Sequence, residues 1–143
     1  YVIADDTVAF LFSHQRIGLP PDGGVSLLLP RVVGHRRASE LILTAAKVEA
    51  DDALRFGLVT RLVASSELGA EAEAQARRFA KAPRGAVGRA KALLASSGQQ
   101  SLSDQLIAER DAIVQSVGEA EFEEGVRAFI EKRKPDFSPP RGD

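Results

Sequence analysis

The chain lacks cysteine, methionine and tryptophan, and it contains two histidines, His14 and His35. The absence of cysteine excludes disulfides, thiolate catalysis and cysteine-ligated metals. Neither histidine has a second ligand at the spacing that metal sites use, so the sequence predicts no metal site. The chain opens at Tyr1 in an apolar run without any methionine, which predicts a fragment whose start lies upstream of Tyr1.

An excess of charge of either sign is also missing. Among the 143 residues, 19 basic side chains are balanced by 20 acidic ones, for a formal net charge of -1. No nucleic-acid or membrane partner is expected, because either would favour a basic excess. No apolar run reaches the roughly 20 residues of a membrane span, and no secretory leader is recognisable. The composition predicts a cytoplasmic protein whose partner is a small molecule or another protein.

The first 63 residues carry the predicted strands. Residues 1–4 and 8–12 are rich in β-branched and aromatic residues and flank Asp5-Asp6-Thr7, which predicts two strands around a tight turn that form one small sheet element. A helix is expected from Gly23, with Pro30 forcing a kink or a fresh start. Further helices are predicted over residues 36–45 and 48–57, and a further strand over 58–63.

Residues after 63 are predicted to be helical and then irregular. Apolar stripes rich in alanine indicate four consecutive helices. Prolines in the last nine residues predict a flexible tail over 135–143. The fold class is therefore α/β with its strands near the start of the chain. The four helices are expected over residues 65–82, 83–98, 101–117 and 122–133.

Asp22 is the only carboxylate among residues 10–34, and it stands where a strand passes through a Gly- and Pro-rich turn into a helix. A rigidly held, exposed turn of this kind often carries a reactive group. Alternatively, Asp22 is the N-cap of the helix that follows. The two roles compete, because a carboxylate that accepts helix amides is a poorer base.

Five runs of this sequence, taken together and in this order, form a recognisable pattern. They are Ile17-Gly-Leu-Pro-Pro-Asp-Gly-Gly, Leu29-Pro-Arg-Val-Val-Gly34, Arg37-Ala-Ser-Glu-Leu-Ile-Leu-Thr44, Ala50-Asp-Asp-Ala-Leu-Arg-Phe-Gly-Leu-Val59 and the run from Glu124 to Pro135. These runs resemble the enoyl-CoA hydratase/isomerase (crotonase) family, and the last is similar to that family's C-terminus. The similarity extends over essentially all 143 residues, but over only about the C-terminal half of a family subunit.

The resemblance implies a crotonase-like β-β-α superhelix. Residues 1–63 would be the last core strands and helices, residues 64–134 a helical trimerisation region, and residues 135–143 the flexible tail. It implies an acyl-CoA thioester substrate, coenzyme A as the substrate's carrier with no prosthetic group, and a homotrimer or dimer of trimers. In the family, two backbone amides hold the thioester oxygen as an enolate forms. Both lie upstream of Tyr1, so this chain alone is expected to be inactive.

The resemblance also assigns the two candidate catalytic residues, His14 and Asp22. Family hydratases use two glutamates, one of them upstream of Tyr1; His14 occupies the position of the second. Asp22 lies where isomerase-like and dehalogenase-like branches place their working carboxylate. One carboxylate can move a double bond by taking a proton and returning it elsewhere. The sequence therefore favours isomerisation of an enoyl-CoA.

Three alternatives to isomerisation remain open. One is hydration of an enoyl-CoA. Another is a different enolate-stabilising reaction, such as dehalogenation or thioester hydrolysis, in which Asp22 would be a nucleophile. The third is a non-catalytic CoA-binding homologue. His14 is an acid/base group, a group that contacts the substrate, or a hydrogen-bonded lining residue.

Phe129 and Lys132 match positions at which family members contact the adenine and phosphates of CoA, often across a subunit boundary. Their i, i+3 spacing predicts that both lie on one face of the last helix. A phenylalanine could stack on the adenine while a lysine attracts phosphate. The alternative is a core phenylalanine and an exposed lysine.

Overall fold

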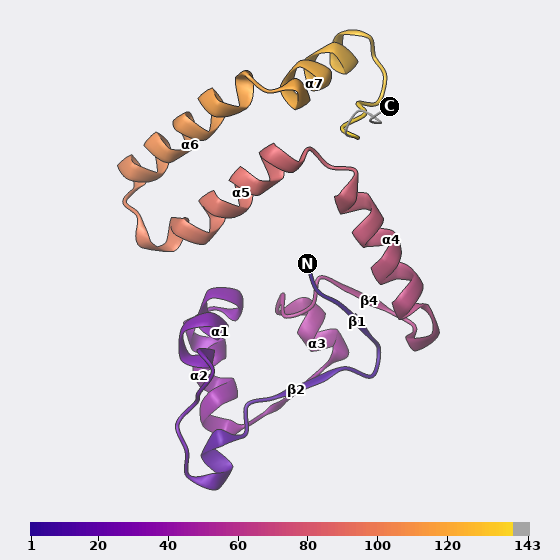
Figure 1. The fold of residues 1–143 in the computed structure, drawn as a ribbon. Coiled ribbons are helices and arrows are strands. Elements are labelled where there is room, and N and C mark those ends of the chain that lie inside the picture. The colour runs from indigo at the N-terminus through magenta and orange to yellow at the C-terminus, as the bar shows by residue number, and fades with distance from the viewer. Residues whose placement is uncertain (139–143) are drawn as a thin grey trace. The chain divides into compact units, whose positions relative to one another are not determined.

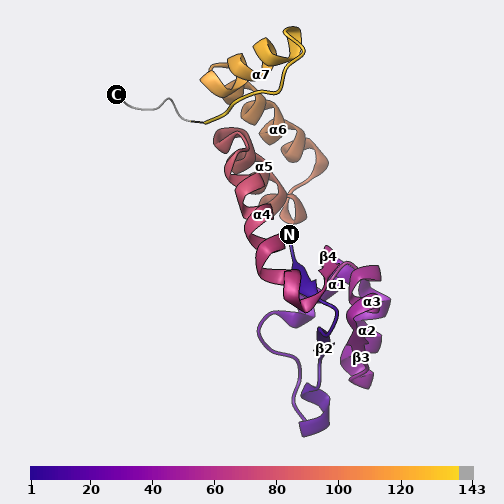
Figure 2. The same ribbon diagram turned by 90° about the vertical axis from the view of Figure 1, so that its right-hand side faces the viewer.

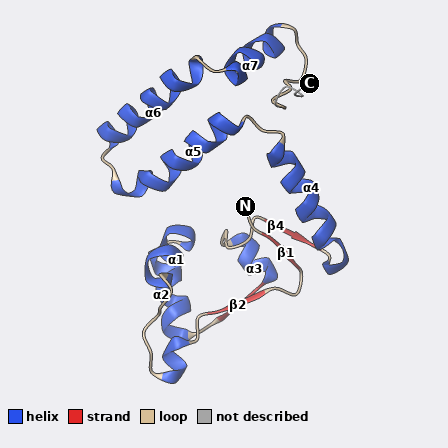
Figure 3. Ribbon diagram, viewed as in Figure 1, coloured by secondary structure: helices blue, strands red, loops and turns tan. Residues whose placement is uncertain are grey.

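The computed structural model describes residues 1–138, which form two compact units (Figure 1). The first unit comprises Tyr1–Ala74 and the second begins at Gln75, within helix α4 (Leu68–Ala80). Each unit is described on its own. All four strands belong to the first unit, as Figure 3 shows, and the described part of the second unit is helical apart from its connections and its end. The predicted domain limits at residues 63 and 134 stay predictions.

The first unit contains two small two-stranded sheets. Strand β1 (Ile3–Asp5) pairs in parallel with β4 (Arg61–Val63), and β2 (Ala9–Leu11) pairs in antiparallel fashion with β3 (Lys47–Glu49). The prediction that the first two strands form one sheet element with each other was wrong. The turn after β1 is tight, with the Asp5 carboxylate accepting from the Thr7 amide and hydroxyl. Beyond that turn, however, each strand has its partner more than 35 residues further on.

Three α-helices lie wholly within the first unit, which also holds the start of α4: α1 (Val25–Val33), α2 (His35–Thr44) and α3 (Ala50–Arg55). Helix α1 continues through Pro30 without a fresh start. The carbonyl that residue 30 would otherwise bind belongs to the exposed Ser26, where water can satisfy it. The prediction of one helix over 48–57 was wrong at its start. Lys47–Glu49 form β3, in which Val48 is buried, and the helix begins only at Ala50. The buried core consists of Leu29, Ala38, Leu41, Val48, Ala53 and Val59.

The second unit contains α5 (Arg84–Ser96), α6 (Leu102–Val117) and α7 (Ala120–Ile130). Helices α5 and α6 lie side by side (Figure 1 and Figure 2). In the described part of this unit, Ala128 is the only buried residue. Most of its large apolar side chains are exposed, so it has almost no interior of its own. They include Leu94 on α5, Leu102, Leu106, Ile113 and Val114 on α6, and Phe129 and Ile130 on α7.

Carboxylates at the start of α7 hold the start of α5. Glu121 accepts the backbone N–H groups of Arg84 at 2.8 Å and of Gly85 at 3.0 Å, which are the first two amides of α5. These amides have no partner within their own helix, so the carboxylate both satisfies them and complements the helix dipole. Glu119 forms a two-pronged ion pair with Arg89, at 2.8 and 2.5 Å. This pair lowers the pKa of Glu119.

No helix in the described part of the chain is both long enough and apolar enough to cross a membrane.

Alanine substitutions at Gly88 and Gly85 test the contact between α5 and α7. Gly88 is exposed within α5 and an added Cβ would meet nothing within 4 Å. Gly88→Ala should therefore raise the free energy of unfolding by about 0.5–1 kcal/mol, the usual helix preference for alanine. At Gly85, a Cβ would lie 2.6 Å from Glu119 Oε2 and 2.9 Å from Arg89 Nη2, so the ion pair has to shift and the gain should be smaller.

Urea unfolding of both variants beside wild type measures this difference. Equal stabilisation by the two substitutions would contradict the placement of the Glu119–Arg89 pair against Gly85.

Candidate functional site

His14 and Asp22 lie at the two ends of a tight loop in the first unit. His14 begins a short 3-10 helix, His14–Ile17, which ends at Gly18 in the left-handed region with φ of 74°. The amide of Leu19 then donates to the carbonyl of His14 at 3.1 Å. This closure turns the chain back on itself, so that residue 22 returns to residue 14. The helix that follows, α1, begins only after two further residues with positive φ, Gly23 and Gly24.

The structure brings the two sequence-predicted catalytic residues into contact. His14 Nε2 lies 3.1 Å from Asp22 Oδ1, a hydrogen-bonding distance at which the imidazole N–H donates to the carboxylate. The side chain of His14 is 24% exposed and that of Asp22 is 87% exposed. The carboxylate is therefore accessible, while the imidazole supports it from a more buried position.

The side chain of Asp22 does not cap α1. The N-cap residue of this helix is Gly24, and no side chain accepts its first amides. Asp22 contributes through its backbone instead, because its carbonyl accepts the Val25 N–H at 3.0 Å. The alternative prediction, that the side chain of Asp22 is the N-cap of this helix, was therefore wrong. Its carboxylate remains available for other chemistry.

An apolar hollow of about 260 Å³ is lined in part by Gly23, the residue after Asp22. No charged side chain lines it. It suits an uncharged carbon chain better than a polar group. Its lining comprises Gly23 with Leu29 and the side chains of Phe10, Phe12, Val25, Leu28, Val32 and Leu58.

Arg16 anchors the loop, a role that the sequence reasoning missed. Its guanidinium donates to the carbonyl of Ala45 at 2.9 Å, across 29 residues of sequence. Ala45 is buried and has a left-handed backbone with φ of 49°, which is costly for a residue with a Cβ. The arginine therefore ties the His14–Ile17 turn to the end of α2. No local sequence signal marks this contact, because an arginine in a polar turn is ordinary.

The second pair of predicted site residues, Phe129 and Lys132, belongs to the second unit. Helix α7 ends at Ile130, so the prediction of a helix through Arg133 with both residues on one face was wrong. Lys132 has a left-handed backbone, with φ of 54°. Its amide donates to Phe129 O at 3.3 Å and that of Arg133 to Ala128 O at 3.0 Å, the Schellman pattern of a helix end. Phe129 is 85% exposed and is not a core residue within the described chain.

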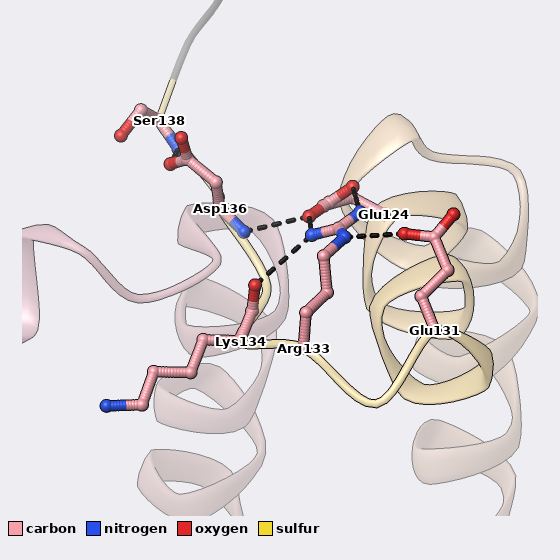
Figure 4. Close-up of polar contacts among 6 residues, drawn as sticks. All are labelled: Glu124, Glu131, Arg133, Lys134, Asp136 and Ser138. Atoms are coloured by element: carbon pink, nitrogen blue, oxygen red, sulfur yellow. Dashed lines mark hydrogen bonds and ion pairs between the residues drawn. The ribbon is translucent and has the colours of Figure 1, made fainter.

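An ion-pair network fixes the backbone around Lys132 (Figure 4). Arg133 donates from Nη1 and Nη2 to the two oxygens of Glu124, at 2.6 and 2.9 Å, and from Nε to Glu131 at 2.6 Å. The Asp136 amide also donates to Glu124, at 2.8 Å. These contacts, chiefly that of Arg133, lower the pKa of Glu124 from 4.5 to about 2. They explain physically why the run from Glu124 to Pro135 contains a glutamate and an arginine nine residues apart.

The predicted tail is described only in part. Residues 135–138 are irregular, and the Asp136 amide is bound by Glu124 while the Phe137 ring lies near Gly125. Residues 139–143 lie outside the described residues, so the predicted flexibility of 135–143 stays a prediction.

The family model for enoyl-CoA hydratase/isomerase matches residues 1–140, and the chain belongs to this family. It is 35% identical over 137 residues to 1,2-epoxyphenylacetyl-CoA isomerase of Escherichia coli (strain K12), covering 96% of this chain and 52% of that protein. It is 31% identical over 130 residues to 4-chlorobenzoyl coenzyme A dehalogenase-1 of Arthrobacter sp, covering 91% and 47%.

A solved structure of enoyl-CoA hydratase from Bacillus anthracis matches the fold with a TM-score of 0.88 and 30% identity, covering 94% of this chain and 52% of that one. The predicted family and the crotonase-like α/β fold are thereby confirmed. The chain spans about half the length of the curated relatives it matches.

The pH dependence of stability tests the Glu124–Arg133 pair. The pKa of Glu124 in the folded protein, about 2, lies below its ordinary 4.5, so the stabilisation is complete above about pH 4.5 and is lost as the pH falls toward 2. Glu124→Gln should lower the Tm at neutral pH, and its difference from wild type should shrink between pH 4.5 and 2.

Glu123→Gln, the same chemical change one residue earlier, is the control for charge loss on α7. Thermal unfolding followed by circular dichroism measures all three proteins. A difference between Glu124→Gln and wild type that stays constant across this pH range would contradict the assignment.

Proposed function

We propose that the complete protein containing this chain moves the double bond of an enoyl-CoA thioester, with Asp22 as the acid/base group. One observation carries the proposal: the Asp22 carboxylate is exposed and is bound by His14 at 3.1 Å, and the next residue, Gly23, lines the apolar hollow. For this reaction, an acyl chain seated in that hollow has to place the carbons next to the thioester within reach of the carboxylate. Coenzyme A would be the carrier of the substrate, with no prosthetic group.

The chemistry needs a single carboxylate. Asp22 would take a proton from one carbon of the acyl chain, leaving an enolate of the thioester, and would return it to the carbon at the other end of the conjugated system. The enolate needs hydrogen-bond donors at the thioester oxygen. The family resemblance places those donors in sequence upstream of Tyr1.

Hydration is less well supported by the residues at this site. It would need a second carboxylate to activate water, and the position that carries it in the resemblance holds His14. A nucleophilic Asp22, as in dehalogenation or thioester hydrolysis, is the stronger alternative, because its carboxylate is 87% exposed. A non-catalytic CoA-binding protein is the remaining one.

We also propose that Phe129 and Lys132 contact the adenine and phosphate groups of CoA. Phe129 presents an almost fully exposed ring, which is able to stack on a base. The Schellman turn fixes the backbone from which the Lys132 ammonium group extends. Neither contact uses the carboxylates that bind Arg133, so ligand binding and helix termination are separate tasks of this segment.

We also propose that the protein self-associates into a trimer or a dimer of trimers through the exposed apolar side chains of α5, α6 and α7. Burying such surface is the main favourable term in subunit association.

Replacing Asp22 tests the proposed reaction. In the complete protein, Asp22→Asn should lower kcat for conversion of a 3-enoyl-CoA to the 2-enoyl-CoA by about 10²–10⁴-fold, the usual contribution of an acid/base group. Binding of CoA, measured by calorimetry, should change little, because the substitution removes a proton carrier and not a contact to the nucleotide. Asp51→Asn, an exposed aspartate at the start of α3, is the matched control.

Three outcomes would decide against isomerisation by Asp22. Turnover that survives in Asp22→Asn places the base elsewhere. A covalent acyl or aryl adduct on Asp22 in wild type supports the nucleophilic alternative. CoA binding without turnover of any acyl-CoA in a panel of 3-enoyl, 2-enoyl and haloaryl thioesters supports the non-catalytic one.

Lys132→Asn tests the phosphate contact. Asparagine tolerates the left-handed backbone of residue 132, so the fold is kept while the charge is removed. The dissociation constant for CoA should rise about tenfold or more, the usual cost of losing a charged hydrogen bond. Lys134→Asn removes the same charge from a side chain that points away from the ion-pair network (Figure 4) and should leave binding nearly unchanged. Equal weakening by both variants would contradict a specific role of Lys132.

A further inference from the structure

We propose that His14 is a positioning residue, which holds Asp22 through an Nε2–H to Oδ1 hydrogen bond and transfers no proton to or from the substrate. This inference rests on the proposed function of Asp22 and gives the hydrogen bond of His14 a role in place of proton transfer. In this role, the imidazole of His14 helps to orient the Asp22 carboxylate, which is the proposed base.

The positions of both ring nitrogens support this role. Nε2 lies 3.1 Å from Asp22 Oδ1 and is occupied by that contact. Nδ1 is buried and has no hydrogen-bond partner among the described residues. A histidine that exchanges protons with a substrate must present a nitrogen to it. In this geometry one nitrogen faces the carboxylate and the other is buried.

The same contacts select one tautomer of the neutral ring. If the hydrogen were on Nδ1, a buried donor would lack an acceptor, and the bare Nε2 would face a carboxylate oxygen. With the hydrogen on Nε2, the ring donates to Oδ1, and the acceptor nitrogen Nδ1 is the one group left without a partner among the described residues. The structure therefore favours the Nε2–H tautomer.

The hydrogen bond has a consequence for the carboxylate. Asp22 is exposed, and an exposed aspartate samples several rotamers. Binding of Oδ1 to the ring restricts this freedom and leaves Oδ2 as the oxygen available to act on the substrate. The second oxygen keeps the function of base, while the first sets its direction.

Arg16 on the turn, and Arg37 and His35 on the neighbouring helix α2, have partners other than His14. Arg16, in the same turn, donates to Ala45 O. On α2, which packs against the turn, Arg37 pairs with Glu40, and the ring of His35 contacts Ser39. Among the described residues, Asp22 is thus the charged group that contacts the imidazole of His14. The turn that carries His14 is held in place by Arg16.

Two substitutions at His14 separate positioning from proton transfer. In the complete protein, His14→Phe keeps a ring of similar size but loses the donor, and kcat for 3-enoyl-CoA isomerisation should fall about ten- to a hundredfold with little change in KM. His14→Gln supplies a non-titrating N–H donor near the position of Nε2 and should restore most of that loss, with both limbs of the pH profile of kcat/KM retained. Thermal unfolding checks that both variants are folded. A loss in His14→Gln as large as that in His14→Phe, or loss of one limb, would make His14 an acid/base group and overturn the proposal.

A readout that needs no turnover keeps this test separate from that of the proposed function. Long-range ¹H–¹⁵N correlation spectra of wild type, with His14 assigned by its absence in His14→Gln, report which nitrogen carries the hydrogen. The Nε2–H tautomer in wild type and a shifted Nε2 signal in Asp22→Asn are expected. An Nδ1–H tautomer, or a His14 spectrum unchanged in Asp22→Asn, would overturn the positioning role. Absence of isomerase activity in wild type would instead count against the proposed function alone.

Discussion

The antiparallel pairing of β2 with β3 is the constraint on which the candidate site depends. It places Phe10 opposite the buried Val48, and it ends at Leu11, three residues before His14. Arg16 adds a second connection a few residues further on, to the carbonyl of Ala45 just before β3. The strand before the loop and the first turn of the loop are therefore both attached to residues 45–49. Because its base is fixed in this way, the loop that brings Asp22 back to His14 needs no hydrophobic contacts of its own. Its carboxylate can be exposed and still be held in one place.

The sequence predicted where this loop lies but not how its side chains are used. Glycine and proline around residues 17–24 indicated a turn, and the isolated Asp22 marked it as a candidate site. Whether Asp22 capped the next helix depended on one backbone detail, the left-handed Gly24 in the N-cap position. No residue pattern reveals that detail, because glycine is compatible with many turns. The contact of His14 with Asp22 was equally hidden, since it follows from a chain reversal and not from a helical spacing.

Elsewhere, local signals were overruled by contacts with distant residues. The turn over Asp5-Asp6-Thr7 suggested that the first two strands pair, but the partners came from residues 47–49 and 61–63. Similarly, the apolar period of α7 favoured a helix through Arg133. Lysine is a good helix former, so Lys132 gave no sign of a left-handed backbone. The sharper turn brings the chain after α7 back against the helix, where Arg133 forms a bidentate pair with Glu124. This pair stabilises the turn. Long-range contacts of this kind are outside the reach of periodicity.

The second unit shows how polar contacts can define helix geometry where a core is missing. Glu121 binds the first amides of α5, Glu119 binds Arg89, and Glu124 binds Arg133, so each contact joins the start of α7 to another segment. Together they set the direction of the helices but bury little apolar area. Exposed ion pairs each contribute little to stability, whereas burial of apolar surface contributes in proportion to its area. The exposed leucines and isoleucines of α6 are therefore apolar surface whose burial would stabilise this unit further. That gain requires apolar surface outside the described helices, which is the physical reason for proposing that subunits associate through this unit.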